Sequence, residues 1–336
     1  MIDLIGYGAF FLVTALIFGV LALGLNLQWG QTGLFNVGVA GFAAIGAYAS
    51  ALVTTPDAAD RFGGFGWPIA AGWLLAMVLA GGAALVVGIA TLRLRADYLA
   101  MTTFGIAVTI QVVALNATAL TGGPFGIAFI PRPFAGLAEN PLAFNVANLA
   151  LTGAVTLGLF LMLETLTRSP FGRVLRAIRE DEAAAASLGK NVNAYRLQAF
   201  ALGGAIMGLA GAMQAHFIGF IAPDNYLSIL TFQVWAMLIV GGSGNNRGAL
   251  IGALVVWALW SLSSLAVGSL VAPSYQARAA ALQIVAIGVA LALILLIRPR
   301  GLIGERATVS RDVESVPGAG ADPGARERTG MPADKT

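Results

Sequence analysis

Long apolar runs separated by short polar segments fill the chain up to residue 297. A helix needs roughly 20 mostly apolar residues to cross a bilayer, and nine segments come close to that length or exceed it. They are residues 8–27, 34–53, 67–92, 98–120, 144–166, 197–217, 227–240, 249–271 and 279–297. The pattern predicts an all-α, polytopic integral membrane protein with about 8–10 transmembrane helices.

Two of these segments are less regular than the others. The second is rich in Gly and follows the polar run 28–33, and the seventh is short and follows Pro223, Asp224 and Asn225. Short or interrupted apolar segments in transporters are often half-helices or re-entrant pieces that line a cavity. We therefore expect these two segments to depart from simple spans.

Basic residues orient the chain. If the loop 167–196 is cytoplasmic, alternation of nine spans also places residues 93–97, 241–248 and the tail from residue 298 in the cytoplasm. All of the 19 Lys and Arg residues except Arg61, Arg132 and Arg278 then lie on that side. Because Lys and Arg accumulate in cytoplasmic loops, we expect the N-terminus outside and the C-terminus inside.

Composition supports a membrane protein and narrows its chemistry. Hydrophobic residues make up 58% of the 336 positions and charged residues 10%, whereas a soluble domain carries about 25% charged residues. Cys is absent and His216 is the single His, which excludes disulfides, catalytic thiols and zinc sites of the His/Cys type. We expect no cofactor.

The composition changes abruptly near residue 305, where Gly, Pro, Ala and charged residues replace the apolar runs. Such a segment cannot bury a core. The chain is therefore predicted to consist of a membrane domain, residues 1–304, and a disordered cytoplasmic tail, residues 305–336. The first ten residues lack a basic n-region, so we expect residues 1–27 to form the first span and not a cleaved signal peptide.

The loop 167–196 contains an amphipathic segment. Ser169 is a good N-cap with Pro170 at the first helical position, and Gly189 is a plausible helix stop. We predict one short helix over residues 173–188, in which an apolar stripe is formed by Val174, Leu175, Ile178, Ala185 and Leu188. Such a helix either lies on lipid headgroups or docks a soluble partner.

This segment, with Glu182-Ala183-Ala184 before Gly189, resembles the coupling-helix loop of ABC importer permeases. More narrowly, it resembles the branched-chain amino acid (LivM-type) permeases. The stretches 24–38, 46–48, 94–100, 120–127, 219–224 and 239–244 agree with that family in the same order, so the resemblance extends over residues 4–304. One departure is that four residues, not three, separate Ala184 from Gly189.

The resemblance implies a permease domain over residues 1–304, possessing inverted-topology repeats, in the bacterial inner membrane. It implies import of branched-chain or related amino acids, with urea or short-chain amides as the alternative cargo. The implied partners are a second permease subunit, two cytoplasmic ATP-binding subunits and an extracytoplasmic binding protein. The residues it assigns to ATPase coupling are Arg173, Arg176, Ile178, Arg179, Glu180, Asp181, Glu182 and Gly189.

The chain carries no ATPase motif of its own. A phosphate loop needs Gly-Lys followed by Ser or Thr, and the single Gly-Lys pair, Gly189-Lys190, is followed by Asn191. We therefore expect a transport subunit that is not itself an enzyme, with ATP hydrolysis in its partners.

Polar residues inside the predicted spans are costly in lipid unless they are paired or face water. Each is more simply an interhelical hydrogen-bond partner, but together they suggest a polar, almost uncharged path that suits a small zwitterion. The candidates for such a path are Asn36, Gln111, Asn116, His216 and Gln233.

Two other function classes compete with this interpretation. An ion-coupled carrier normally needs a buried carboxylate, and Glu164 is predicted near a cytoplasmic helix end. An intramembrane serine protease would need Ser243, in Gly241-Gly242-Ser243-Gly244, to lie beside a general base. The topology predicts that His216 and Ser243 lie near opposite membrane faces, which disfavours the protease.

Overall fold

The computed structural model describes residues 4–57, 62–270, 275–298 and 301–304. Residues 1–304 form one compact unit. The tail predicted over residues 305–336 lies outside the described residues, as does Arg61. Its described residues are all-α apart from one short strand pair, which confirms the predicted fold class.

Each of the nine predicted segments contains a helix. In chain order the helices are α1 (Leu4–Leu25), α2 (Val39–Thr54), α3 (Ile69–Thr91), α4 (Ala96–Asn116), α6 (Pro141–Arg168), α9 (Val192–Ile218), α10 (Ser228–Gly241), α11 (Asn246–Leu270) and α12 (Gln276–Ile297). Shorter elements connect them: η1 (Asn26–Gly30), α5 (Thr118–Thr121), η2 (Gly123–Phe125), β1 (Ile127–Ala128), η3 (Ala135–Leu137), α7 (Pro170–Glu180), α8 (Glu182–Ser187), β2 (Phe220–Ile221) and η4 (Pro223–Tyr226).

Among the described residues, six helices are long and apolar enough to cross a membrane by length and composition. They are α1 together with η1, α3, α4, α6, α9 and α11. The second and seventh predicted segments form the shorter helices α2, of 16 residues, and α10, of 14 residues. In α12 the apolar stretch is also short, covering residues Ala281–Ile294.

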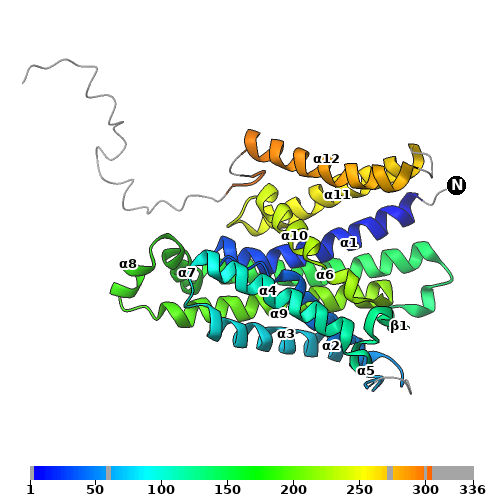
Figure 1. Ribbon diagram of the computed structural model, residues 1–336, viewed down its shortest axis with the longest axis horizontal. Helices are drawn as coiled ribbons and strands as arrows, with labels where there is room; N and C mark the ends of the chain where they lie inside the picture. Colours follow the sequence, from blue (N-terminus) through cyan, green and yellow to red (C-terminus); the bar gives the residue numbers. More distant parts are fainter. Residues whose placement is uncertain (1–3, 58–61, 271–274, 299–300, 305–336) are drawn as a thin grey trace, which may run out of the picture. The chain divides into compact units, whose positions relative to one another are not determined.

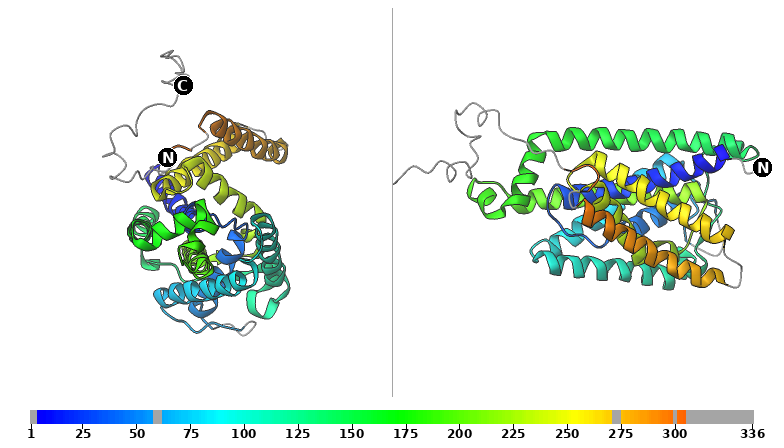
Figure 2. Two further views of the ribbon diagram at one scale, coloured as in Figure 1. Left: turned by 90° about the vertical axis from the view of Figure 1, so that its left-hand side faces the viewer. Right: turned by 90° about the horizontal axis from the view of Figure 1, so that it is seen from above.

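The connections between helices gather at two opposite ends of the unit (Figure 1). At one end lie α7, α8, the α3–α4 turn and the turn between α10 and α11. In that last turn, Asn245 Nδ2 donates to the carbonyl oxygen of Gly304 at 3.3 Å. At the other end, β1 pairs antiparallel with β2, with Ile127 opposite Ile221. The helices run roughly along one common direction, so a view from the α7–α8 end looks down most of their axes (Figure 2).

Small residues allow the central helices to approach closely. A Cβ at Gly204 or Gly208 of α9 would collide with Ala84 or Ala80 of α3. In the same way, a Cβ at Gly252 of α11 would collide with the backbone of α10. Apolar lipid provides little hydrophobic drive between helices, so close backbone packing is a main source of their association. The Gly spacings in these helices therefore serve packing.

Candidate functional site

The amphipathic loop segment forms two helices, α7 and α8, where one helix over residues 173–188 was predicted. Asp181 separates them in an extended conformation (φ −152°, ψ 104°), and its Oδ1 accepts a hydrogen bond from Ala184 N at 2.9 Å. An Asp side chain that caps a new helix satisfies backbone donors that a continuous helix would otherwise satisfy. The prediction of a single helix was wrong for this reason.

The ends of the segment follow the sequence signals only in part. Pro170 occupies the first turn of α7, and Gly189 follows α8 with a φ of 76°. Ser169 stands at the N-cap position of α7, but its hydroxyl donates back to Leu166 O at 2.6 Å and caps no N–H group of α7. The capping role predicted for Ser169 is therefore absent.

The apolar stripe of the segment faces the rest of the chain. Leu175 is fully buried in the main core, and Ile178 is 4% exposed in a small cluster with Ala185 and Val192. Leu188 departs from the predicted stripe, because it is 79% exposed. The apolar side of the segment is thus packed against the ends of the spans, and its charged side faces away from them.

Arg179 connects α7 to the end of the first helix. Its Nη1 donates to the carbonyl oxygen of Gly30, the last residue of the π-helical turn η1, and its Nη2 lies 2.7 Å from Glu180 Oε1. Gly33, three residues further, has a φ of 74°, and a Cβ there would stand 3.2 Å from Arg179 Cγ. A residue with a side chain at position 33 would be strained and crowded, so Gly permits this contact.

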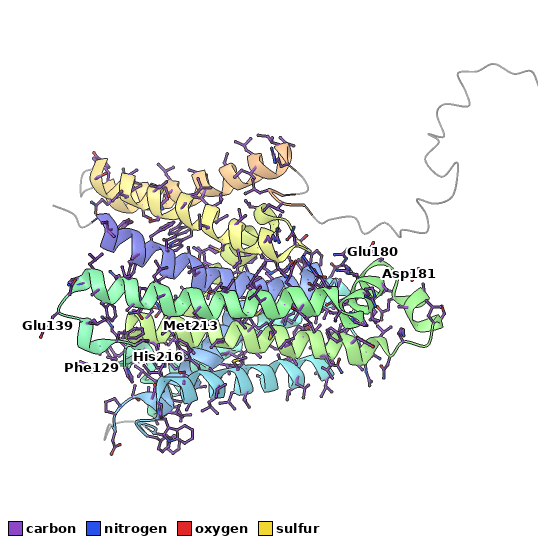
Figure 3. The ribbon with its side chains drawn as sticks, turned by 180° about the vertical axis from the view of Figure 1, so that it is seen from behind. Phe129, Glu139, Glu180, Asp181, Met213 and His216 are labelled. Atoms are coloured by element: carbon purple, nitrogen blue, oxygen red, sulfur yellow. The ribbon has the colours of Figure 1, made fainter. Side chains whose placement is uncertain are left out.

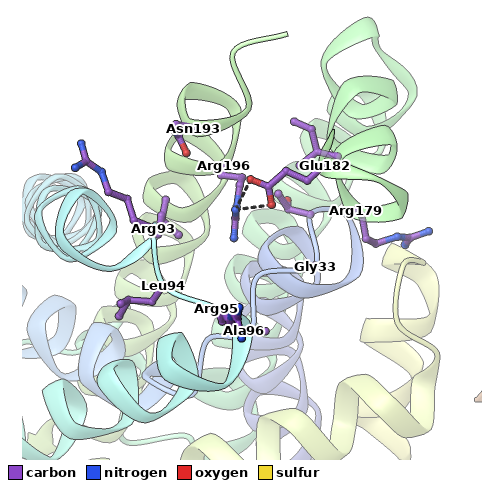
Figure 4. A pocket seen from close by; sticks show the side chains of 12 residues that line it. Gly33, Arg93, Leu94, Arg95, Ala96, Arg179, Glu182, Asn193 and Arg196 are labelled. Carbon is purple, nitrogen blue, oxygen red and sulfur yellow. Dashed lines mark hydrogen bonds and ion pairs between the residues drawn. The ribbon is translucent and has the colours of Figure 1, made fainter. Parts of the chain in front are cut away.

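An ion pair connects α8 to α9. Arg196 Nη1 lies 3.0 Å from both carboxylate oxygens of Glu182, and the Arg196 side chain is only 14% exposed (Figure 4). The pair borders a cavity of about 520 Å³ between the α3–α4 turn, the α7–α8 segment and the start of α9. Arg93, Arg95 and Arg179 also line this cavity.

The first helix does not continue into α2. After the π-helical turn η1, residues 31–38 are non-helical, although most of them are buried. Gln28 Nε2 donates to Phe200 O, and Asn36 Nδ2 donates to Gln28 Oε1, both at 2.7 Å. Trp235 Nε1 of α10 donates to Asn36 O at 2.9 Å. Side chains thus replace helical backbone bonds at this break, as membrane-embedded backbone requires.

Threonine hydroxyl groups on two helices accept hydrogen bonds from the backbone at and just after the break. Val37 N donates to Thr103 Oγ1 of α4, and Ala40 N donates to Thr231 Oγ1 of α10, both at 3.0 Å. The break therefore contacts α4, α9 and α10 as well as α7. π-Helical turns occur frequently at functional sites, so this region is the main candidate for a mobile element of the spans.

A second polar network connects the first helix to α11 and α6. Asn26 Nδ2 donates to Asn246 Oδ1 at 2.9 Å, and Asn246 Nδ2 donates to Glu164 Oε2 at 3.2 Å. The other Glu164 oxygen pairs with Arg168 at 2.5 Å. Neither Asn26 nor its link to Glu164 was predicted from the sequence, although Asn26 lies within the stretch 24–38 that resembles the family.

His216 lies near the C-terminal end of α9, close to Phe129 and Glu139 and far from Glu180 and Asp181 (Figure 3). It is fully buried, with Nε2 2.8 Å from Ser50 Oγ and Nδ1 2.7 Å from Pro131 O. Both ring nitrogens therefore have partners from other segments. Ser243 follows α10 at the α7–α8 end, so the pair that a serine protease would need is not brought together.

The five predicted path residues do not converge on one site. Asn36 belongs to the helix break and His216 to the opposite half of the unit. Gln111 on α4 and Gln233 on α10 are half-buried, and Asn116 is exposed, with its Nδ2 bonded to Val112 O of its own helix at 2.7 Å. Among the described residues, none of the five hydrogen-bonds to another of them.

Two tyrosines that sequence reasoning missed lie near η4. The rings of Tyr48 and Tyr226 have centroids 6.2 Å apart. Both hydroxyls are buried and have no hydrogen-bond partner among the described residues. Burial, and then the neighbouring Tyr48, raises the pKa of Tyr226, so its phenol stays neutral. Unpaired buried hydroxyls of this kind are available to a polar solute or to water.

Comparison with known proteins gives a consistent family. The sequence profile described as "Branched-chain amino acid transport system / permease component" matches residues 8–297. The chain is 34% identical over 267 residues to the high-affinity branched-chain amino acid transport system permease protein LivM of Escherichia coli K12. That alignment covers 72% of this chain and 60% of the relative, so the chain spans about three fifths of its length.

Two more distant relatives align over most of their length. A probable branched-chain amino acid transport permease protein LivM of Methanocaldococcus jannaschii is 26% identical over 335 residues, which cover 87% of this chain and 91% of the relative. The permease protein LivH of Escherichia coli K12 is 27% identical over 297 residues, covering 85% and 91%. No solved structure matches the chain.

Proposed function

Because this chain belongs to the family of permease components of branched-chain amino acid transport systems, we propose that it is the membrane-crossing subunit of an ATP-driven importer for such amino acids. The observation that carries the proposal is the α7–α8 segment, which is buried against the span ends and bonded through Arg179 to the break after the first helix. A segment so placed can pass the motion of a soluble partner to the spans.

In this proposal the α7–α8 end faces the cytoplasm. Arg93, Arg95, Arg247 and the basic residues of α7 lie at that end, and the positive-inside rule places such residues in the cytoplasm. The first described residues of α1 then lie outside the cell and Gly304 lies inside, which gives the N-out, C-in orientation.

The docking surface for the ATP-binding subunits is the outer side of α7 and α8. Arg173, Glu180, Glu182 and Leu188 are exposed there, and Leu188 adds an apolar side chain to this charged surface. Ile178 is buried within the chain, so its part in coupling is to hold the segment and not to contact the partner. Gly189 follows α8 and marks the end of this surface.

Coupling of ATP binding to transport requires that these contacts adopt two different arrangements. Binding of ATP by the docked subunits displaces α7, and Arg179 and the buried Leu175 carry that displacement to the helix break and the core. The energy comes from the different stability of outward-open and inward-open states when ATP is bound, and no bond in the cargo is made or broken.

The assembly we infer contains a second permease subunit, two ATP-binding subunits and an extracytoplasmic binding protein. The names of the relatives, LivM and LivH, support branched-chain amino acids as cargo. Urea or a short-chain amide remains the alternative cargo. Glu164 is bonded to Arg168 and Asn246, an arrangement that favours a structural role over ion coupling.

The experiment is reconstitution of the purified complex in proteoliposomes with its binding protein. We expect uptake of labelled leucine, isoleucine or valine that requires ATP on the α7–α8 side, with urea and acetamide as matched controls. Uptake of urea or acetamide alone would move the assignment to the alternative cargo. Uptake driven by a proton or sodium gradient without ATP would contradict the proposal.

A further inference from the structure

The cavity beside the α3–α4 turn carries a surplus of positive charge. Four arginines, Arg93, Arg95, Arg179 and Arg196, are among the residues that line its volume of about 520 Å³, together with one acidic residue, Glu182 (Figure 4). Arg196 is held by Glu182, and Arg179 is bonded to Gly30 and Glu180. The side chains of Arg93 and Arg95 have no hydrogen bond or ion pair with any described residue.

The start of α4 adds to the positive potential of this cavity. Ala96, the first residue of the helix, lines the cavity, and Arg95 at the N-cap position provides no side-chain hydrogen bond to the helix. The unpaired N–H groups at a helix N-terminus favour an anion. Asp97 lies in the first turn but is not part of the cavity lining.

From this geometry we propose that the cavity, together with the apolar start of α4, binds an anionic phospholipid, with the headgroup phosphate between Arg95, Arg93 and Arg196. The position of the cavity relative to the spans supports a lipid. α3 ends at Thr91 and α4 begins at Ala96, and both helices are long and apolar enough to cross a membrane. The turn between them therefore lies at the membrane boundary, which is the level of the headgroups.

The surface below the cavity fits the rest of such a molecule. Leu94 borders the cavity and is 39% exposed, and on the first two turns of α4 Tyr98 is 61% and Met101 71% exposed. An acyl chain can cover these apolar side chains while its phosphate occupies the cavity. A basic pocket between membrane helices combined with an adjacent apolar surface is a recognised form of lipid headgroup site.

The test uses the full chain purified in detergent and measures lipid binding, so it does not depend on transport or on its cargo. Phosphatidylglycerol and phosphatidylcholine with identical acyl chains are titrated separately, and bound lipid is counted by native mass spectrometry. Replacing Arg93 and Arg95 by Gln together should weaken phosphatidylglycerol binding by about thirtyfold. Arg247→Gln removes an exposed arginine outside the cavity and should leave the affinity unchanged.

Further variants and competitors distinguish a phospholipid from other occupants of the cavity. The double replacement of Arg93 and Arg95 by Lys keeps both charges and should retain most of the phosphatidylglycerol affinity, while phosphatidylcholine should bind weakly to every variant. Equal phosphatidylglycerol binding by the wild type and the Gln variant would overturn the proposal. Displacement of the lipid by inorganic phosphate at equal concentration would assign the cavity to free phosphate. Displacement by added ATP-binding subunits would assign it to an acidic surface of that partner.

Discussion

The guanidinium of Arg179 on α7 donates a hydrogen bond to the carbonyl oxygen of Gly30, which lies 149 positions earlier in the chain. Gly30 is the last residue of the π-helical turn where the first helix stops, and residues 31–38 then run without helical structure to α2. This hydrogen bond joins α7 directly to the break after the first helix.

We expect Arg179→Gln to uncouple ATP hydrolysis from transport. A hydrogen bond from a charged donor contributes about 1.5–3 kcal/mol, so its loss should lower uptake per ATP by about 10- to 100-fold. The ATP-binding subunits should still co-purify, because the outer side of α7 is unchanged. Uptake and ATPase activity are measured on the same proteoliposomes, with Arg247→Gln as the control. A loss of ATPase co-purification would instead place Arg179 in the docking surface.

Ile178 and Leu188 provide a matched pair for the docking surface, because Ile178 is 4% exposed and Leu188 is 79% exposed. Leu188→Asp should leave the fold intact and weaken retention of the ATP-binding subunits, since burial of a leucine contributes about 1.5–3 kcal/mol. Ile178→Asp should instead loosen the α7–α8 segment, because a charge would enter an apolar cluster. Pull-down and limited proteolysis separate the two effects. Full retention by Leu188→Asp would contradict docking at this surface.

The ion pair between Glu182 and Arg196 stabilises the packing of α8 on α9. Its partner lies within this chain, so Glu182→Ala should weaken that packing by about 0.2–1 kcal/mol, the range for a pair with one exposed member. The exchanged pair, Glu182→Arg with Arg196→Glu, should recover most of the loss. The thermal midpoint of the purified chain provides the measurement. Equal midpoints for the single and exchanged variants would show that the pair contributes nothing.

His216 should be structural. It connects Ser50 on α2 with Pro131 in the loop after β1, and removal of a buried partner leaves polar groups unsatisfied at about 1–3 kcal/mol. We therefore expect His216→Ala to lower the thermal midpoint, while His216→Gln retains more stability and most of the uptake. The pH profile of uptake should be the same for wild type and His216→Gln. A lost pH response together with lost uptake would favour proton coupling.

The orientation can be tested with single cysteines, because the chain has none of its own. Ser187 and Ala138 are both exposed. Ser187 ends α8, the helix that Asp181 caps, and Ala138 precedes Glu139; Asp181 and Glu139 lie at opposite ends of the unit (Figure 3). In intact cells, an impermeant maleimide should label Ala138→Cys and should label Ser187→Cys only after the cytoplasmic side is opened. The reverse pattern would invert the proposed orientation.

The sequence alone determined the number and the approximate bounds of the main helices. A run of apolar residues is a local property, and lipid forces its backbone bonds to close within the helix, so 249–271 and 144–166 were correctly predicted as helices. The same holds for the break before α2, which the Gly-rich segment and the polar run before it indicated.

Only the tertiary structure decided which polar groups meet. Asn26 bonds to Asn246, Glu182 pairs with Arg196, and Arg179 bonds to Gly30, because helices distant in sequence pack side by side. Residue spacing contains no information about which of these groups meet. The apolar stripe of α7 illustrates the same limit. Its periodicity predicted an apolar side, but a partner and the chain's own core are equally good places to bury Ile178, and the packing of α7 on the span ends selected the core.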